Sequence, residues 1–227
     1  MIIGKGLIGK GLEKIDCKEF VFFASGVSNS KSTDNNEFSR EINLLEKTLD
    51  ENGDKCIIYF STTSIHDQSV NTNPYINHKL EVEKLIRKKA KSYLIIRTGN
   101  IVGDNANKNT IFSFLLNSVK NSIPFILWKN SYRNFLHIED FVKMVDYAVN
   151  ILSKRKEVIC LINPKDINVL NLVEMMEMKL KTKGVYAMED KGSSFDTDKS
   201  LSIYIFNALA LEGDDYEEKL IEKYFLK

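Results

Sequence analysis

The sequence is poor in several residue types, and each shortage narrows the possible classes of protein. Its 227 residues include only three Pro and three Cys, so it contains no Pro-rich linker. Cys17, Cys56 and Cys160 are widely spaced and form no C-x-x-C pair, so neither a disulfide framework nor a metal site is predicted. Cys56 and Cys160 adjoin apolar runs, which is typical of buried free thiols in a reducing compartment.

The chain also lacks an excess of charge and a long apolar segment. It has 32 basic and 31 acidic residues, and the basic ones are scattered, so no surface for nucleic acid or for an anionic membrane is predicted. No apolar run approaches the roughly 18 residues of a transmembrane helix. The first apolar stretch is interrupted by Gly and Lys, unlike a signal peptide. A soluble cytoplasmic protein is therefore expected.

Solid apolar blocks alternate with segments of helical periodicity along the chain. Strands are predicted near residues 1–3, 19–26, 55–64, 92–98, 124–128 and 157–163. Helices are predicted near residues 7–15, 35–52, 75–90, 110–121, 138–152 and 168–181, and residues 184–227 show weak periodicity before a final amphipathic helix. This alternation predicts an α/β fold, a parallel sheet with helices on both faces.

The segment "GKGLIG" places Gly4, Gly6 and Gly9 between the first strand and the first helix. In that context G-x-G-x-x-G lets the backbone approach a pyrophosphate at a helix N-terminus. The alternative is a Gly-rich turn that binds nothing. A dinucleotide fold also needs an acidic residue on the next strand, but Glu13 and Asp16 fall on or just after the short helix. The part of the site that would hold the adenosine is therefore incomplete.

Hydroxyl side chains end the strand that reads "FSTTS", and the next helix opens with a Tyr. These hydroxyls lie where open α/β sheets bind ligands, although they can equally well cap the following loop. Tyr75 and Lys79 are one helical turn apart, and an ammonium beside a phenol lowers its pKa from about 10, as a general acid/base needs. About one Tyr-x-x-x-Lys match is expected by chance in a chain with nine Tyr, so two ordinary helix residues remain the alternative.

The order of six motifs resembles that of a known family. The motifs are "GKGLIG", "FFASG", "FSTTSI", "PYINHK", "IIRTGN" and "RNFLHIEDF". From residue 1 to about 180, the chain resembles extended short-chain dehydrogenase/reductases of the NAD-dependent epimerase/dehydratase family. The resemblance implies a Rossmann-like domain over 1–162, with 112–134 partly in a C-terminal substrate lobe that spans 163–227. It also implies NAD or NADP as cofactor and a nucleotide-sugar as substrate, in the synthesis of surface polysaccharides.

The resemblance also implies roles for individual residues. It assigns catalysis to Tyr75, Lys79 and Thr62; cofactor binding to Gly4, Gly6, Leu7, Ile8, Gly9, Ala24, Ser25 and Lys79; and substrate binding to Thr63, Asn100 and Arg133. Tyr75 would transfer a proton, Lys79 would contact the nicotinamide ribose, and Thr62 would hold the reacting sugar oxygen. Arg133 and Asn100 would bind the diphosphate. The alternatives for these last two are a surface Arg and a turn Asn.

Several departures from the family pattern limit what the resemblance implies. The sequence predicts that the family's second strand, its helix and the third strand are deleted, which affects cofactor affinity and the choice between NAD and NADP. Thr63 and Ser64 stand where the family's dehydratases carry Asp-Glu, so an epimerase or a 4-ketoreductase is favoured over a dehydratase. The alternatives are a degenerate member that acts as a ligand-binding or regulatory module, and a purely structural subunit.

Three other side chains and one surface are given structural interpretations. His66 and His137 are predicted to be structural, and Trp128 to pack in the core or the lobe, although it could stack on a sugar or base. A homodimer through helices 35–52 and 75–91 is possible, as is common in the family. An exposed apolar patch of Phe38, Ile42 and Leu45 would support it.

Overall fold

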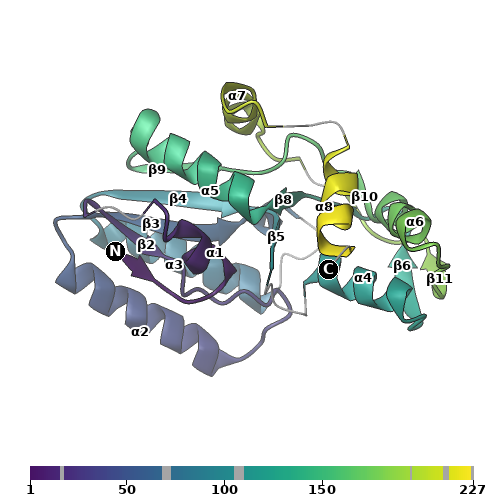
Figure 1. The fold of residues 1–227 in the computed structure, drawn as a ribbon. Coiled ribbons are helices and arrows are strands. Elements are labelled where there is room, and N and C mark those ends of the chain that lie inside the picture. The colour runs from purple at the N-terminus through teal and green to yellow at the C-terminus, as the bar shows by residue number, and fades with distance from the viewer. Residues whose placement is uncertain (16–17, 68–72, 105–109, 195, 212–214, 226–227) are drawn as a thin grey trace.

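The computed structural model describes residues 1–15, 18–67, 73–104, 110–194, 196–211 and 215–225. Its centre is a five-stranded sheet with the order β1–β2–β3–β4–β9, in which all neighbouring strands are parallel (Figure 1). The strands are β1 (Ile2–Ile3), β2 (Phe20–Phe23), β3 (Cys56–Thr62), β4 (Tyr93–Thr98) and β9 (Glu157–Cys160). The predicted α/β fold with a parallel sheet is confirmed.

Helices cover both faces of this sheet. On one face lie α1 (Leu7–Leu12) and α5 (Ile138–Asp146), and on the other lie α2 (Asn35–Glu51) and α3 (Pro74–Lys89). Figure 1 shows α5 and α2 on opposite sides of the strands. In the described residues β1 is an edge strand with no partner on its outer side. That two strands of the family fold are missing stays a prediction.

Side chains alternate between the two faces, as a pleated strand requires. On β3, Ile58 and Phe60 join the core cluster under α5, whereas Ile57 and Tyr59 join the cluster under α2 and α3. Every residue of β2 and β3 is buried. Strands buried on both faces appear as continuous apolar runs, which is why the sequence predicted them well.

A smaller lobe lies beyond the carboxyl ends of the strands (Figure 1). It contains α4 (Ile111–Lys120), β6 (Phe125–Trp128), α6 (Val169–Leu180), β11 (Tyr186–Glu189) and α8 (Tyr216–Phe225). Strand β6 pairs with β11 in parallel. Two further ladders join β5 (Asn100–Val102) to β8 (Phe135–His137), and β7 (Tyr132–Arg133) to β10 (Ile167–Asn168). The predicted domain boundary at residue 162 stays a prediction.

Short elements complete the fold, and several were not predicted. A 3-10 helix (Thr63–His66) follows β3, a π-helical turn (Tyr147–Ile151) ends α5, and α7 (Ser200–Ala208) packs near α5 and β9. The Gly-containing loop predicted after β4 is a second strand, β5. In the tail, β11 and α7 were missed. Within the described part of the chain, no helix is both long and apolar enough to cross a membrane.

Some predictions about individual residues need correction. Trp128 is 46% exposed, so it is not a core residue. Leu45 is fully buried, and Phe38 and Ile42 pack against core clusters, so these three do not form the exposed patch that would have supported a dimer. Cys56 is a buried free thiol and Cys160 a half-buried one, whereas Cys17 lies outside the described residues.

Candidate active site

The predicted catalytic residues meet at the carboxyl end of β3. Thr62 is the last residue of that strand, and Tyr75 lies in the first turn of α3. Asn73 caps this helix, since its Oδ1 accepts a hydrogen bond of 2.9 Å from the backbone N–H of Tyr75. Tyr75 and Thr62 are both buried, and the Thr62 side chain interacts with the Tyr75 hydroxyl. The Nζ atom of Lys79, one turn further along α3, lies 5.7 Å from the centroid of the Tyr75 ring.

Lys79 points into the protein and not into solvent. The residue is 2% exposed, and its Nζ donates to the Tyr59 hydroxyl at 2.9 Å and to Glu41 Oε1 at 3.2 Å. An ammonium has three hydrogens, so the described residues provide acceptors for two of them. The third has no acceptor among these residues.

Glu41 is the centre of this network, and the sequence analysis missed it. Its side chain is fully buried on α2. Oε1 accepts from Tyr59 at 2.7 Å and from Lys79, while Oε2 accepts from the Val27 backbone at 2.6 Å and lies 2.9 Å from His78 Nε2. Burial alone would raise the pKa of Glu41. The His78 bond, the Lys79 charge and the bonds from Val27 and Tyr59 outweigh burial and lower that pKa to about 2. Glu41 is therefore an anion.

The electrostatics around Tyr75 differ from the prediction. Burial raises the pKa of Tyr75, the negative charge of Glu41 raises it further, and the interaction with Thr62 only partly opposes them. That Lys79 lowers this pKa stays a prediction, since the causes of the shift are burial, Glu41 and Thr62. The Lys79 charge is paired with Glu41, and burial lowers the pKa of Lys79 itself while Glu41 opposes that change. At neutral pH Tyr75 is a protonated phenol.

The glycine loop before α1 has two tightly packed positions and one open position. A Cβ on Gly4, which has φ +125°, would lie 2.3 Å from Ala24 O, so no other residue fits there. A Cβ on Gly6 would meet no atom within 4 Å. Gly6 caps α1, which begins at Leu7 and Ile8, so the start of this helix faces open space. A phosphate can approach this backbone.

Two other residues assigned to cofactor binding also lie at this loop. Gly9 is packed against it, because a Cβ there would lie 2.4 Å from Gly4 O. Ser25 follows Ala24 at the end of β2 and is tied to α2, since Arg40 donates to its Oγ at 3.3 Å and to its carbonyl at 3.1 Å. Arg40 was not predicted from the sequence.

The three predicted substrate-binding residues lie on separate elements. Thr63 is buried and donates from Oγ1 to Thr98 O at 3.4 Å, and Asn100 donates from Nδ2 to Asn134 O at 3.0 Å. The guanidinium of the half-buried Arg133 forms its one hydrogen bond in the described part of the chain with Tyr132 O. Burial lowers the pKa of Arg133, and Asp67 opposes that change.

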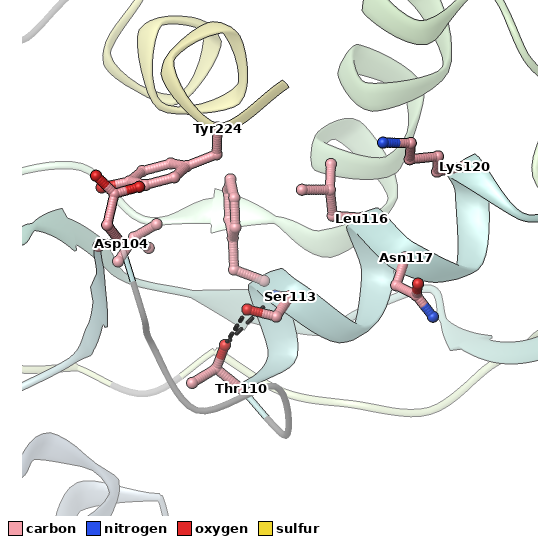
Figure 2. Close-up of a pocket in the computed structure, with 10 residues that line it drawn as sticks. Asp104, Thr110, Ser113, Leu116, Asn117, Lys120 and Tyr224 are labelled. Carbon is pink, nitrogen blue, oxygen red and sulfur yellow. Dashed lines mark hydrogen bonds between the residues drawn. The ribbon is translucent and has the colours of Figure 1, made fainter. Parts of the chain in front are cut away.

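Two cavities lie near this edge of the sheet. Thr63 and Arg133 line a cavity of about 10 Å³, which has room for no more than one water molecule. A larger cavity of about 290 Å³ opens between the end of β5, α4 and α8. Figure 2 shows Asp104, Ser113 and Tyr224 around it. None of the predicted catalytic residues lines either cavity.

The two histidines predicted to be structural are both hydrogen-bonded. His66 Nε2 lies 3.3 Å from Arg97 Nη1. His137 caps α5 by accepting from the backbone of Glu139, and its Nε2 lies 2.7 Å from the Tyr224 hydroxyl. These contacts support the structural role predicted for both residues.

Comparison with known proteins agrees with this geometry. Residues 21–169 match the family described as NAD dependent epimerase/dehydratase family. The chain belongs to this family. Family members and structural neighbours bind NAD(P), and the family contains nucleotide-sugar epimerases and dehydratases. No curated protein matches the chain.

Solved structures show the same fold at low sequence identity. MoeE5 in complex with UDP-glucose and NAD has a TM-score of 0.72 and 16% identity, with 99% of this chain and 86% of that chain covered. UDP-glucuronic acid 4-epimerase from Bacillus cereus, in complex with UDP-glucuronic acid and NAD, has a TM-score of 0.69 and 16% identity. The match covers 97% of this chain and 79% of that chain. RMD from Pseudomonas aeruginosa, complexed with NADPH, has a TM-score of 0.67 and 12% identity, with 97% of this chain and 86% of that chain covered.

The described residues fit one half of a nicotinamide dinucleotide better than the other. The open backbone at Gly6 fits the pyrophosphate, and the unused Lys79 hydrogen fits a ribose hydroxyl. Thr98 pairs with Thr62 on the neighbouring strand, and its buried Oγ1 has no hydrogen-bond partner among the described residues. In contrast, no strand among the described residues lies outside β1 to bring an acidic residue to the adenosine ribose.

Proposed function

We propose that this protein is an NAD(P)-dependent epimerase or 4-ketoreductase that acts on a nucleotide-sugar, in a route to surface polysaccharide. The observation that carries the proposal is the position of the buried Tyr75 and Thr62 at the carboxyl end of β3, with the Lys79 Nζ 5.7 Å from the centroid of the Tyr75 ring. Family membership supports the cofactor and the class of substrate.

Each group has a distinct task in this proposal. Tyr75 exchanges its phenolic proton with the reacting sugar oxygen, and Thr62 holds the same oxygen. Lys79 gives its remaining hydrogen to the nicotinamide ribose, and the backbone at Gly6 receives the pyrophosphate. When bound, the nicotinamide supplies or accepts a hydride at the sugar carbon.

Arg133 is the proposed anchor for the substrate diphosphate, with Asn100 beside it. Its guanidinium is half-buried and its one hydrogen bond in the described residues goes to a backbone carbonyl, which leaves donors for an anion. The cavity beside Arg133 is too small for a sugar, so side chains around it must move when the substrate binds.

Cofactor binding is the first test, and the glycine loop offers a well-matched variant. Gly6→Val adds atoms where no protein atom lies nearby, at a residue whose φ of −74° suits any side chain, so the fold is retained. The control is Gly53→Val, on the turn after α2, where a Cβ meets only Leu49 O at 3.7 Å. Calorimetric titrations use NAD, NADH, NADP and NADPH on all three proteins.

We expect wild type and Gly53→Val to bind one of the four with a Kd below about 100 μM, and Gly6→Val to bind it at least about tenfold more weakly. The absence of binding by wild type to any of the four would contradict the proposal, as would equal affinity in Gly6→Val.

A second candidate function is a ligand-binding or regulatory module without hydride chemistry. The edge position of β1 and the six-residue length of α1 favour it, since both reduce the surface available to a dinucleotide. A wild-type protein that binds a nucleotide-sugar but none of the four cofactors would support this candidate.

A further inference from the structure

Arg40 is an exposed cation on α2 whose guanidinium is held at the end of β2. Its Nη1 donates to Ser25 Oγ at 3.3 Å, and its Nη2 donates to the Ser25 carbonyl at 3.1 Å. In the part of the chain that the structure describes, no carboxylate is bonded to Arg40. A guanidinium has five N–H hydrogens, so three of them have no acceptor among these residues. Arg40 therefore has both donors and an unpaired charge for an anion.

Ser25 lies between two parts of the proposed cofactor site. The residue before it is packed against the glycine loop, since a Cβ on Gly4 would lie 2.3 Å from Ala24 O and 2.8 Å from Ser25 N. The residue after it is packed against the other part, since a Cβ on Gly26 would lie 2.7 Å from Lys79 Nζ. A guanidinium bonded to Ser25 is therefore held between the loop and the Lys79 ammonium.

The glycine loop itself provides backbone hydrogens but little fixed positive charge. The helix after it, α1, has only six residues, and the dipole of any helix amounts to no more than about half an elementary charge at its start. Lys5 is an exposed cation within the loop, but its ammonium forms no hydrogen bond with the described residues, so no contact holds it in one position. Each phosphate of a pyrophosphate carries a negative charge. Arg40 is a cation that two hydrogen bonds fix beside this loop.

We propose that Arg40 is a cofactor-binding residue and that its guanidinium binds the pyrophosphate of the nicotinamide cofactor. This inference rests on the proposed function and adds to the site a residue from α2. A planar guanidinium can donate two parallel hydrogen bonds to one phosphate, which a Lys ammonium cannot do. In the described residues no strand outside β1 holds the adenosine ribose, so we expect the pyrophosphate contacts to provide a large share of the affinity.

Calorimetric titration of four proteins tests the inference: wild type, Arg40→Gln, Arg40→Lys and the control Lys47→Gln. Lys47 lies about two turns further along α2, its side chain is 70% exposed, and the change to Gln removes the same charge. We expect Arg40→Gln to bind the preferred nicotinamide cofactor at least about tenfold more weakly than wild type. Lys47→Gln should stay within about twofold of wild type. Arg40→Lys keeps the charge but not the planar fork, so its affinity should fall between these two.

Two further measurements place the contact on the pyrophosphate. ADP-ribose contains the pyrophosphate without the nicotinamide, and we expect Arg40→Gln to weaken its binding by the same factor as that of the whole cofactor. The ratio of the Kd values for NAD and NADP should stay as in wild type, and a loss confined to NADP and NADPH would overturn the assignment. Raising NaCl from about 50 to about 500 mM should narrow the difference between wild type and Arg40→Gln, because salt screens an exposed charge.

The outcomes separate this inference from the proposed function. Wild-type affinity in Arg40→Gln, together with a loss in Gly6→Val, would overturn the inference and leave the proposed function intact. A larger loss in Lys5→Gln than in Arg40→Gln would also overturn it, because Lys5 would then be the principal cation. Absence of binding by wild type to any of the four nicotinamide cofactors would overturn both. Because Arg40 is exposed, the Tm of Arg40→Gln should lie within about 2 °C of the wild-type value, so a loss of affinity is not a loss of folding.

Discussion

Two buried carboxylates lie under the same face of the sheet, and their partners differ. Glu83 on α3 accepts from Arg97 Nε at 2.9 Å and Nη2 at 2.8 Å, from Ser61 at 2.7 Å and from Arg87 at 2.9 Å. Glu41 also contacts four groups, but three of these are the side chains of Lys79, Tyr59 and His78. Guanidinium groups stay charged at any ordinary pH, whereas these groups exchange protons.

The comparison separates a structural site from a site able to tune a reaction. The hydrogen bond that Arg97 donates to Glu83 raises the pKa of Arg97, which is already high, so Arg97 remains a cation. Glu41 accepts a hydrogen bond from Lys79, and the Nζ atom of Lys79 lies 5.7 Å from the centroid of the ring of Tyr75, the candidate catalytic residue. A buried carboxylate alone therefore indicates little about function, and the chemistry of its partners decides what it can do.

The largest expected effect comes from removing the structural carboxylate. Glu83→Ala leaves Arg97 without its partner in a mostly buried position, and we expect a loss of about 3–5 kcal/mol in the free energy of unfolding. Urea denaturation measures it. The exposed Glu81, on the same helix, serves as control, and Glu81→Ala should change stability by no more than about 0.5 kcal/mol. Equal losses in the two variants would contradict the distinction.

The second effect is the contribution of Glu41 to stability as a function of pH. The folded-state pKa of about 2 lies below the ordinary value of 4.5, so the contribution is complete above pH 4.5 and is lost as the pH falls toward 2. We expect roughly 3 kcal/mol to disappear in this window. Urea unfolding between pH 2 and pH 7 measures it, and Glu41→Gln should show a shallower slope there. Parallel pH profiles would show that Glu41 is not the group involved.

A smaller effect is expected from the hydroxyl that links the ion pair. Tyr59→Phe removes a donor to Glu41 and an acceptor for Lys79, and we expect a loss of about 1–3 kcal/mol in the free energy of unfolding. Tyr93→Phe on β4 is the control, because no hydrogen bond of the Tyr93 hydroxyl is found in the described residues, and it should cost less than about 0.5 kcal/mol. A loss in Tyr59→Phe no greater than that of the control would argue against the linking role.

The smallest effect tests the exposed side of the structural site. The Arg87 side chain is 46% exposed, and Glu83 keeps its bonds to Arg97 and Ser61 when Arg87 is removed. Arg87→Ala should therefore cost no more than about 1 kcal/mol in urea denaturation. A loss as large as that of Glu83→Ala would mean that Arg87, rather than Arg97, is the principal partner.

The sequence was sufficient to predict that Thr62, Tyr75 and Lys79 lie near one another. The carboxyl ends of parallel strands share one edge, and a helix that follows such a strand begins near the same edge, so residues at those positions must meet. The same reasoning could not predict the charge around them. That charge depends on α2, and the distance between helices is determined by packing rather than by local pattern.

A signal for Glu41 was nevertheless present. It lies three residues after Phe38 and four before Leu45, in the middle of the apolar stripe of α2. A carboxylate in such a stripe must find partners inside the protein. Its partners Tyr59 and His78 could not be named without the three-dimensional packing. The missed elements β11 and α7 have a similar cause, since the pairing of Tyr186 with Phe125 is not encoded in any local period.

The pairing of β6 with β11 has a consequence for how the protein is made. All strands of the central sheet have been synthesised once a ribosome has added Cys160, but β6 must wait for residues 186–189. Ile126 and Trp128 on β6 stay exposed even in the finished fold, and their strand has an open edge until its partner arrives. Unpaired apolar edges are where nascent chains bind chaperones or aggregate. Each new copy of this protein thus passes through an interval, between the synthesis of β6 and that of β11, in which β6 lacks this partner.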